Sequence, residues 1–330
     1  MQDLRHFTNQ IGEIGAGFRH AQILFVATEA DVFSLLESPR RAEDVAKARD
    51  WSARGARMLL DGLVALGLIE KTDGWYRNAE IASVCLVPGR EGYQGDIIRH
   101  TRDGWDTWAR MEECVRTGNG VPREGGGRSP EGLRNFILGM SNIAVLSAQD
   151  VLGALDLSRY RRLLDVGGGP GTYSIAFVQA HPEMRATLFD LPEVVEIARE
   201  QVEKAGLLER FDFVPGDYKQ DTLGSGHDLV FVSNIIHSLS DAGNRALVRK
   251  CYDALTTGGT LIIKDFLADD GRTGPPFSLI FALHMLIHTG DGDTYTISEV
   301  ADWTRAAGFA EGRLVSITPQ TRLWVVEKEG

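Results

Sequence analysis

Hydrophobic and polar positions follow two different rhythms along this chain, and the change comes near residue 160. Before that point, apolar residues recur every three or four positions, which predicts helices. After it, short apolar runs alternate with helical segments, and this alternation predicts a parallel, doubly wound α/β sheet. The predicted strands are RRLLDV (161–166), RATLFDL (185–191), RFDFVPGDY (210–218), HDLVFVSNIIH (227–237) and TLIIKDF (260–266).

The N-terminal part combines helices with one short hairpin. The predicted helices are AQILFVATEADVFSLLE (21–37), SPRRAEDVAKARD (38–50) and SARGARMLLDGLVALGLIEK (52–71). EKTDGWYRN then predicts two strands joined by an Asp73-Gly74 turn. Three helices followed by a hairpin form a winged-helix pattern. Residues 96–155 are again helical, apart from a loop rich in Gly and Pro at 117–132.

These patterns divide the chain into three segments, 1–95, 96–155 and 156–330.

The formal net charge of −11 argues against general affinity for nucleic acids and for anionic membrane surfaces. No apolar run of about 18 residues occurs, so we expect no membrane-spanning helix. The N-terminus lacks the pattern of a signal peptide. Three widely spaced cysteines, Cys85, Cys114 and Cys251, fit a reducing cytoplasm.

The stretch LLDVGGGPGTYSI, residues 163–175, places a glycine-rich loop between a strand and a helix. A dinucleotide fingerprint G-x-G-x-x-G that starts at Gly167 fails, because Thr172 stands in its sixth position. The pattern present is Asp165-x-Gly167-x-Gly169-x-Gly171, which is typical of S-adenosylmethionine sites. That cofactor carries an ammonium and a sulfonium, so a carboxylate beside bare glycine backbone favours its binding.

Acidic residues also follow the next two predicted strands. Asp190 ends the second strand, where an acidic residue can accept hydrogen bonds from ribose hydroxyls. Asp217 ends the third strand and could accept from the adenine amino group, with Tyr218 beside the ring. The carboxyl ends of parallel strands meet at one sheet edge, so we expect the cofactor there. The candidate set also includes three residues from the same edge, Leu191, Gly216 and Ser233.

The chain resembles S-adenosylmethionine-dependent O-methyltransferases of the hydroxyindole, caffeic acid and bacterial natural-product type. The resemblance rests on LLDVGGGPGTYSI, TLFDLPEVV, FVPGDY, NIIHSLSD and CYDALTTGGTLIIKD, in that order. GLVALGLIEKTDGWYRN is similar to the family's winged-helix dimerisation domain. The resemblance implies a dimerisation domain at 1–95, a helical linker lining the acceptor pocket at 96–155, and a Rossmann-like catalytic domain at 156–330.

The resemblance also implies catalytic residues. His237 in NIIHSLSD occupies the position of the family's general base, and Asp265 in LIIKDF that of the acid that orients the base. Histidine suits proton abstraction near neutral pH. The family's H-D-W triplet is replaced here by His237-Ser238-Leu239. A second family acid has only Asp293 or Thr294 near its place, so the complete arrangement of a base and two acids is not reproduced.

The segment FALHMLIHT places His284 and His288 four residues apart, a spacing that a zinc site can use. Asp291 and Asp293 follow closely, but the glutamate of H-E-x-x-H is missing, so we expect no metal and a helix that lines the acceptor pocket. The candidate lining residues are Trp105, Trp108, Phe136, Met140, Phe281, His284, Met285 and His288. Aromatic residues at helical spacing are also common in protein cores.

A winged helix can also bind DNA. Residues 1–95 carry about 11 basic and 13 acidic side chains, so they lack the basic footprint of a recognition face. The apolar helices then need another cover, and we expect a partner subunit in a homodimer. We therefore expect a cytoplasmic homodimeric methyltransferase that acts on a small aromatic acceptor, with a phenolic hydroxyl as its target. A carbon or nitrogen methyltransferase, a non-methylating relative and a ligand-responsive DNA-binding regulator stay open as alternatives.

Overall fold

The structure, a computed structural model, describes residues 2–121 and 129–329. Contacts divide the chain into two compact units, Met1–Asp103 and Gly104–Gly330. The loop expected at 117–132 lies partly, at 122–128, outside the described residues.

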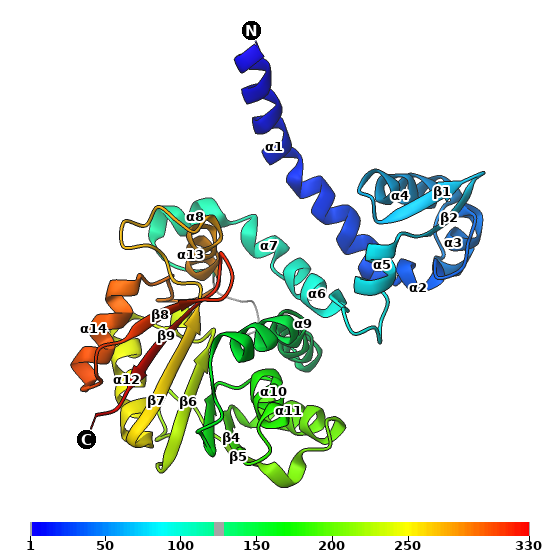
Figure 1. Cartoon of the computed structure of the whole chain (residues 1–330). Coiled ribbons are helices and arrows are strands. Elements are labelled where there is room, and N and C mark those ends of the chain that lie inside the picture. The colour runs from blue at the N-terminus through cyan, green and yellow to red at the C-terminus, as the bar shows by residue number, and fades with distance from the viewer. Residues whose placement is uncertain (1, 122–128, 330) are drawn as a thin grey trace. The chain divides into compact units, whose positions relative to one another are not determined.

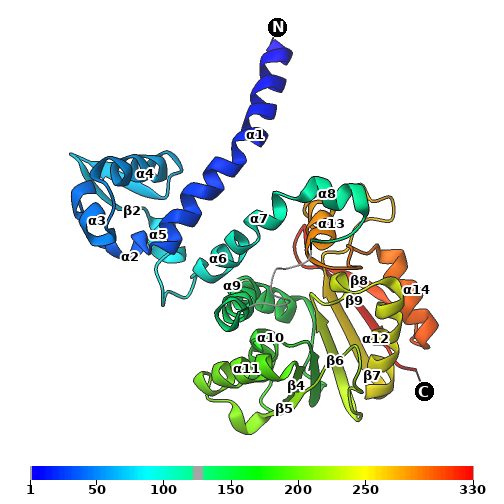
Figure 2. The same ribbon diagram turned by 180° about the vertical axis from the view of Figure 1, so that it is seen from behind.

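The first unit is mainly helical (Figures 1 and 2). Its elements are α1 (Gln2–Glu29), α2 (Val32–Leu35), α3 (Ala42–Arg49), α4 (Ala53–Ala65), β1 (Ile69–Thr72), β2 (Trp75–Asn78), α5 (Glu80–Cys85) and α6 (Gly95–Asp103). The predicted hairpin is present: β1 and β2 pair antiparallel, and both Asp73 and Gly74 have positive φ, as a tight hairpin turn requires. Its core includes Phe33, Leu60, Leu63 and Tyr76.

The helix predicted from residue 21 begins much earlier. α1 already starts at Gln2, and it ends at Glu29 because Asp31 adopts a left-handed φ of 48°. The N-terminal half of α1 extends beyond the rest of its unit in both views (Figures 1 and 2). α6 belongs to the first unit, where Ile98 packs against the core and Arg99 donates to the Tyr93 hydroxyl at 2.8 Å.

The second unit contains a seven-stranded sheet in the described part of the chain, in the order β5-β4-β3-β6-β7-β9-β8. Its strands are β3 (Arg162–Val166), β4 (Arg185–Asp190), β5 (Phe211–Pro215), β6 (His227–Ser233), β7 (Leu255–Asp265), β8 (Arg313–Ser316) and β9 (Arg322–Glu327). Strands β5, β4, β3, β6 and β7 run parallel, as the alternation predicts. The strands β8 and β9, which the sequence analysis did not predict, form a hairpin, and β9 pairs antiparallel with β7.

Helices cover both faces of this sheet (Figure 1). The helical elements are α7 (Trp105–Trp108), α8 (Met111–Thr117), α9 (Pro130–Ala154), α10 (Thr172–Ala180), α11 (Pro192–Lys204), η1 (Leu208–Arg210), η2 (Ile236–Ser238), α12 (Asp241–Ala254), α13 (Pro276–His288) and α14 (Ile297–Ala307). On one face, α9 and α10 pack against Leu163 and Phe231. On the other, α12 and α14 pack against Val230 and Ile263. Because helices cover both faces, the carboxyl ends of the parallel strands are the part of the sheet where a ligand can bind.

One described helix, α9, is long and apolar enough to cross a membrane by length and composition alone. Core helices of soluble proteins pass the same test. Ala144, Ala148 and Val151 of α9 are buried against the sheet of the second unit, as expected of a core helix.

Candidate active site

The glycine-rich loop leaves β3 at Val166 and enters α10 at Thr172. Gly167, Gly169 and Gly171 have φ values of 63°, 55° and 78°, in the left-handed region that glycine adopts without steric cost. A Cβ at Gly167 would lie 2.4 Å from Ile235 Cδ1, so protein atoms occupy that space. A Cβ at Gly169 would meet nothing within 4 Å, so Gly169 presents bare backbone to open space.

Asp190 ties this loop to the end of β4. Its Oδ2 accepts from the Gly169 N–H at 2.8 Å, and its Oδ1 accepts from the Leu191 N–H at 2.7 Å. Burial raises the pKa of Asp190, and the two backbone donors oppose that shift. The Gly216 N–H donates to the Asp190 carbonyl at 2.9 Å, so the loops after β3, β4 and β5 are joined at one edge.

Asp217 and Tyr218 follow β5 at the same edge. The Asp217 carboxylate accepts from the Lys219 N–H at 2.8 Å and from Gln220 Nε2 at 2.9 Å, so it caps its own turn. A Cβ at Gly167 would lie 3.7 Å from the Tyr218 ring. Ser233 ends β6, and its buried Oγ has no hydrogen-bond partner among the described residues.

Asp165 lies beneath the loop. It is only 2% exposed, and its Oδ2 has no hydrogen-bond partner among the described residues. A Cβ at Gly168 would lie 3.0 Å from that oxygen, so the glycine allows the carboxyl group to pack directly under the backbone. Burial raises the pKa of Asp165 to about 7, and hydrogen bonds from Ser174 only partly oppose the shift. A nearby ligand cation would favour the ionised form.

We expect Asp165→Asn to stabilise the ligand-free protein at alkaline pH. Between the ordinary value of 3.8 and about 7, folded wild type holds a proton that the unfolded chain has released. The free energy of unfolding of wild type therefore falls as pH rises through this window. The variant lacks this loss, so its advantage should grow to a few kcal/mol at pH 8, at about 1.4 kcal/mol per pKa unit.

Urea unfolding at pH 5 and pH 8 measures this difference. The control is Asp212→Asn, which removes an exposed carboxylate from β5. An advantage of Asp165→Asn that shrinks from pH 5 to pH 8 would contradict the prediction.

His237 and Asp265 lie together although 28 residues separate them. The distance from His237 Nδ1 to Asp265 Oδ1 is 2.8 Å, and the side chains are 13% and 3% exposed. A carboxylate only accepts hydrogen bonds, so Nδ1 is the donor of this pair, and in the neutral imidazole Nε2 then presents a lone pair. The Phe266 N–H also donates to Asp265 Oδ1 at 2.8 Å, which holds the carboxylate in place. Asp265 can therefore orient His237 as a general base.

His237 is not part of the strand predicted for 227–237. β6 ends at Ser233 because Asn234 adopts a left-handed φ of 57°, and His237 lies in the short helix η2. Asn244 Nδ2 donates to the Ile236 carbonyl at 2.9 Å and fixes this turn. The turn aims the His237 ring at Asp265 on the neighbouring strand.

Neither candidate for a second acid places a free carboxylate beside His237. Asp293 forms an ion pair with Arg272 at 3.4 Å, although its backbone N–H donates to the His237 carbonyl at 3.0 Å. Thr294 is buried, and its hydroxyl donates to the Ser278 carbonyl at 3.1 Å. These two residues therefore support the loop that contacts the His237 backbone.

Two aromatic rings pack against the His237 ring. Phe281 meets it edge-on with ring centroids 4.9 Å apart, and Phe266 stacks at 6.3 Å. Phe277 extends this group, stacking on Phe281 at 5.6 Å. Sequence reasoning missed Phe266 and Phe277, although Phe266 directly follows Asp265 in LIIKDF. We call Phe266, Phe277 and Phe281 the aromatic cluster.

His284 and His288 continue from the aromatic cluster along α13. Their rings stack with centroids 4.0 Å apart, and Trp108 Nε1 donates to His284 Nδ1 at 3.3 Å. His288 Nδ1 lies 3.0 Å from the His284 carbonyl. Among the described residues, no group of three or more His, Cys, Asp or Glu side chains could hold a metal ion.

The remaining candidate lining residues are more dispersed. Met285 is 5% exposed on α13, and Phe136 of α9 packs with Val194 and Ile197 of α11. Met140 is half-buried on α9, and Trp105 is half-buried on α7. Trp108, Phe281, His284 and His288 are thus the candidates that adjoin one another.

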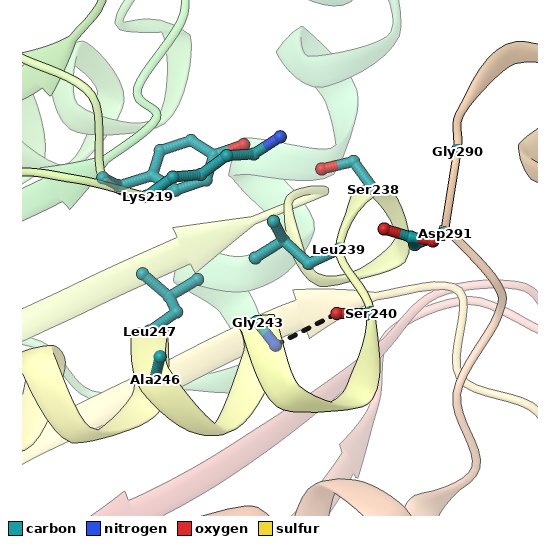
Figure 3. Close-up of a pocket in the computed structure, with 10 residues that line it drawn as sticks. Lys219, Ser238, Leu239, Ser240, Gly243, Ala246, Leu247, Gly290 and Asp291 are labelled. Carbon is teal, nitrogen blue, oxygen red and sulfur yellow. Dashed lines mark hydrogen bonds between the residues drawn. The ribbon is translucent and has the colours of Figure 1, made fainter.

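A pocket of about 280 Å³ lies beside this site, between the Tyr218 loop, the N-terminal end of α12 and the loop at Gly290. Figure 3 shows Lys219, Ser238 and Asp291 along it, with Ala246 and Leu247 of α12. The pocket shares Tyr218 with the candidate cofactor residues, but neither His237 nor the glycine loop lines it. It therefore borders the site described above.

The residues at the strand ends fit S-adenosylmethionine. Three groups there make no contact that would compete with a ligand among the described residues. They are the open backbone at Gly169, Oδ2 of Asp165 and Oγ of Ser233, and the two oxygens have no hydrogen-bond partner. Asp190 and Asp217 keep further lone pairs for ribose or adenine donors.

Comparisons with known proteins place the chain in a family. Residues 109–310 match the O-methyltransferase domain, and residues 13–88 match the O-methyltransferase dimerisation domain. The chain is 36% identical to 3-hydroxy-5-methyl-1-naphthoate 3-O-methyltransferase from Streptomyces sahachiroi, over 92% of this chain and 90% of the relative. It is 32% identical to acetylserotonin O-methyltransferase from Bos taurus, over 91% of this chain and 92% of the relative.

Solved structures agree. The crystal structure of human N-acetylserotonin methyltransferase in complex with S-adenosylmethionine has a TM-score of 0.90, 27% identity and 98% coverage of both chains. PigF with S-adenosylhomocysteine has a TM-score of 0.90 and 26% identity, covering 97% of this chain and 99% of PigF. The predictions of the fold and of the cofactor are confirmed. This chain belongs to the S-adenosylmethionine-dependent O-methyltransferase family.

Proposed function

We propose that this enzyme methylates a phenolic hydroxyl of a small aromatic molecule, with His237 as the general base. The observation that carries the proposal is the 2.8 Å contact from His237 Nδ1 to Asp265 Oδ1, next to the aromatic cluster. An aromatic acceptor is supported by relatives that act on a hydroxynaphthoate and on acetylserotonin, as their names state.

S-adenosylmethionine, when bound, supplies a methyl group on a positively charged sulfur. We assign its binding to Asp165, Gly167, Gly169, Gly171, Asp190, Leu191, Gly216, Asp217, Tyr218 and Ser233. His237 Nε2 would accept the hydroxyl proton of the acceptor, which makes the acceptor oxygen a stronger nucleophile. Asp265 would stabilise the resulting imidazolium through Nδ1. The aromatic cluster and α13 would exclude water and hold a flat ring.

Product analysis tests this proposal. The enzyme is incubated with cofactor carrying a CD₃ group and a panel of phenols, indoles, quinols and anilines, and products are identified by mass spectrometry. A labelled methyl ether is the expected product. A relative 29% identical to this chain is named N,N-dimethyltransferase OxyT, from Streptomyces rimosus. Labelled products from amines alone would replace the phenol proposal with N-methylation.

We further propose a homodimer formed through α1. Leu4, Phe7, Ile11, Ile14 and Phe18 are 53–72% exposed and recur at alternating spacings of three and four, the pattern of a coiled-coil seam. Gly12, Gly15 and Gly17 each weaken the helix by about 1 kcal/mol relative to alanine. Packing against a second copy would stabilise this half of α1.

The double variant Ile11→Asp/Ile14→Asp should be monomeric, because two buried charges at the seam would be unpaired. Asn9→Asp/Ala16→Asp places the same charges on the opposite face of α1 and should stay dimeric. Light scattering with mass determination separates the outcomes. A dimeric Ile11→Asp/Ile14→Asp variant would exclude this seam.

We also propose that the enzyme works in the cytoplasm. Cys85, Cys114 and Cys251 are all free thiols, which fits a reducing compartment.

A further inference from the structure

Lys264 is a buried cation without a carboxylate partner. It is 2% exposed at the carboxyl end of β7, and no Asp or Glu oxygen of the described residues lies within 4 Å of its Nζ. Nζ donates to Asn234 Oδ1 at 3.2 Å and lies 5.2 Å from the centre of the Tyr173 ring. Burying an ammonium group with only neutral partners is costly, so an anionic partner is expected from outside the chain.

The strand register places Lys264 on the same sheet face as two other polar residues. Ser233 pairs with Lys264, and Asp165 pairs with Phe231, which is two residues before Ser233. Side chains alternate along a strand, so Asp165, Ser233 and Lys264 share the face that α10 covers. Asp165 Oδ2 and Ser233 Oγ are buried without partners among the described residues.

The turn at Asn234 holds the Lys264 side chain in place. Asn234 adopts a left-handed φ of 57°, and its N–H donates to the Lys264 carbonyl at 2.9 Å. The same residue accepts from Nζ through its side chain. Tyr173, whose ring lies near Nζ, is in the first turn of α10, directly after the glycine loop. Lys264 is therefore held beside that loop.

We propose that Lys264 binds the carboxylate of the amino-acid end of the cofactor, opposite Asp165, which faces the ammonium. This end carries one negative and one positive charge on the same carbon. Asp165 and Lys264 belong to β3 and β7, on either side of β6, and Lys264 lies two residues further along its strand. Two strand spacings of about 4.8 Å and two residues of about 3.3 Å each place their backbones about 12 Å apart. Ser233 lies between them and completes the polar set. This inference rests on the proposed cofactor site.

Calorimetric binding of three ligands tests the proposal. S-adenosylhomocysteine has both charges, its decarboxylated analogue keeps only the ammonium, and 5′-methylthioadenosine has neither. Wild type should bind S-adenosylhomocysteine about ten- to a hundredfold more tightly than the decarboxylated analogue, the usual effect of a hydrogen bond between charged groups. Lys264→Met should lose that preference while binding the other two ligands within about threefold of wild type.

Lys328→Met is the matched control. Lys328 is half-buried, and its Nζ, like that of Lys264, has neutral oxygen partners and an aromatic ring nearby: it donates to the carbonyls of Tyr252 and Leu255 at 2.7 Å and lies near the Tyr252 ring. It follows the last strand, away from the glycine loop. It should leave all three affinities unchanged. Lys264→Arg keeps the cation and should retain the carboxylate preference.

Three results would overturn the proposal. Wild type could show no preference for the carboxylate, a measurement that needs no variant. Lys264→Met could keep the full preference, or it could weaken all three ligands equally, which would indicate a structural role. If wild type bound none of the ligands, the proposed cofactor site would itself fail, and the inference with it.

Discussion

His237→Ala should lower turnover by about a hundredfold to ten-thousandfold, the usual contribution of a positioned general base. Its affinity for S-adenosylhomocysteine should stay within about threefold of wild type, because the His237 ring faces Asp265 and the aromatic cluster. Single-turnover rates with an identified acceptor measure the chemical step, and calorimetry measures ligand affinity.

The variant His237→Asn distinguishes a catalytic role of His237 as a base from a purely structural role. The asparagine amide N–H can still donate to Asp265, but an amide does not accept a proton at neutral pH. This variant should therefore be about as slow as His237→Ala. Asp265→Asn removes only the charge that orients the ring and stabilises the imidazolium, so it should cost less than either. A His237→Asn variant within threefold of wild type would remove His237 from the base role and favour an acceptor that is already nucleophilic.

Gly169→Val should lower the affinity for S-adenosylhomocysteine at least a thousandfold. A Cβ there would meet no protein atom within 4 Å, so the added side chain enters the open space proposed for the ligand. A branched residue also resists the φ of 55° and would shift the N–H that donates to Asp190. Calorimetry or equilibrium dialysis measures the loss.

Gly206→Val controls for backbone strain. Gly206 also has a positive φ, 71°, and a Cβ there would also meet nothing within 4 Å, but it follows α11, away from the loop. Both variants should lose similar thermal stability, since both place a branched residue in the left-handed region. Gly206→Val should bind S-adenosylhomocysteine like wild type. Equal loss of affinity in both variants would show that strain, and not ligand contact, explains Gly169→Val.

Local sequence patterns were sufficient to predict the main architecture of both units. Strand and helix periodicity predicted the five parallel strands, and Asp73-Gly74 predicted the hairpin of the first unit, because each depends on neighbouring residues. The antiparallel β8 and β9 were not predicted. β8 pairs with β9, and only β9 pairs with β7, which lies far earlier in the chain, so the place of this hairpin in the sheet depends on a long-range contact. The N-terminal half of α1 was not among the helices predicted by range, because glycines interrupt its apolar pattern and its apolar side chains are exposed in this chain.

The sequence by itself determined the family, the glycine loop and the acids at the strand ends, because parallel strands bring consecutive strand ends to one sheet edge. Only the tertiary structure decided which side chains meet there. The left-handed turn at Asn234 moved His237 off the strand and aimed it at Asp265, and the register of β6 with β7 placed Lys264 on the face of Asp165. Side-chain direction depends on register and turn geometry, which neither spacing nor composition encodes.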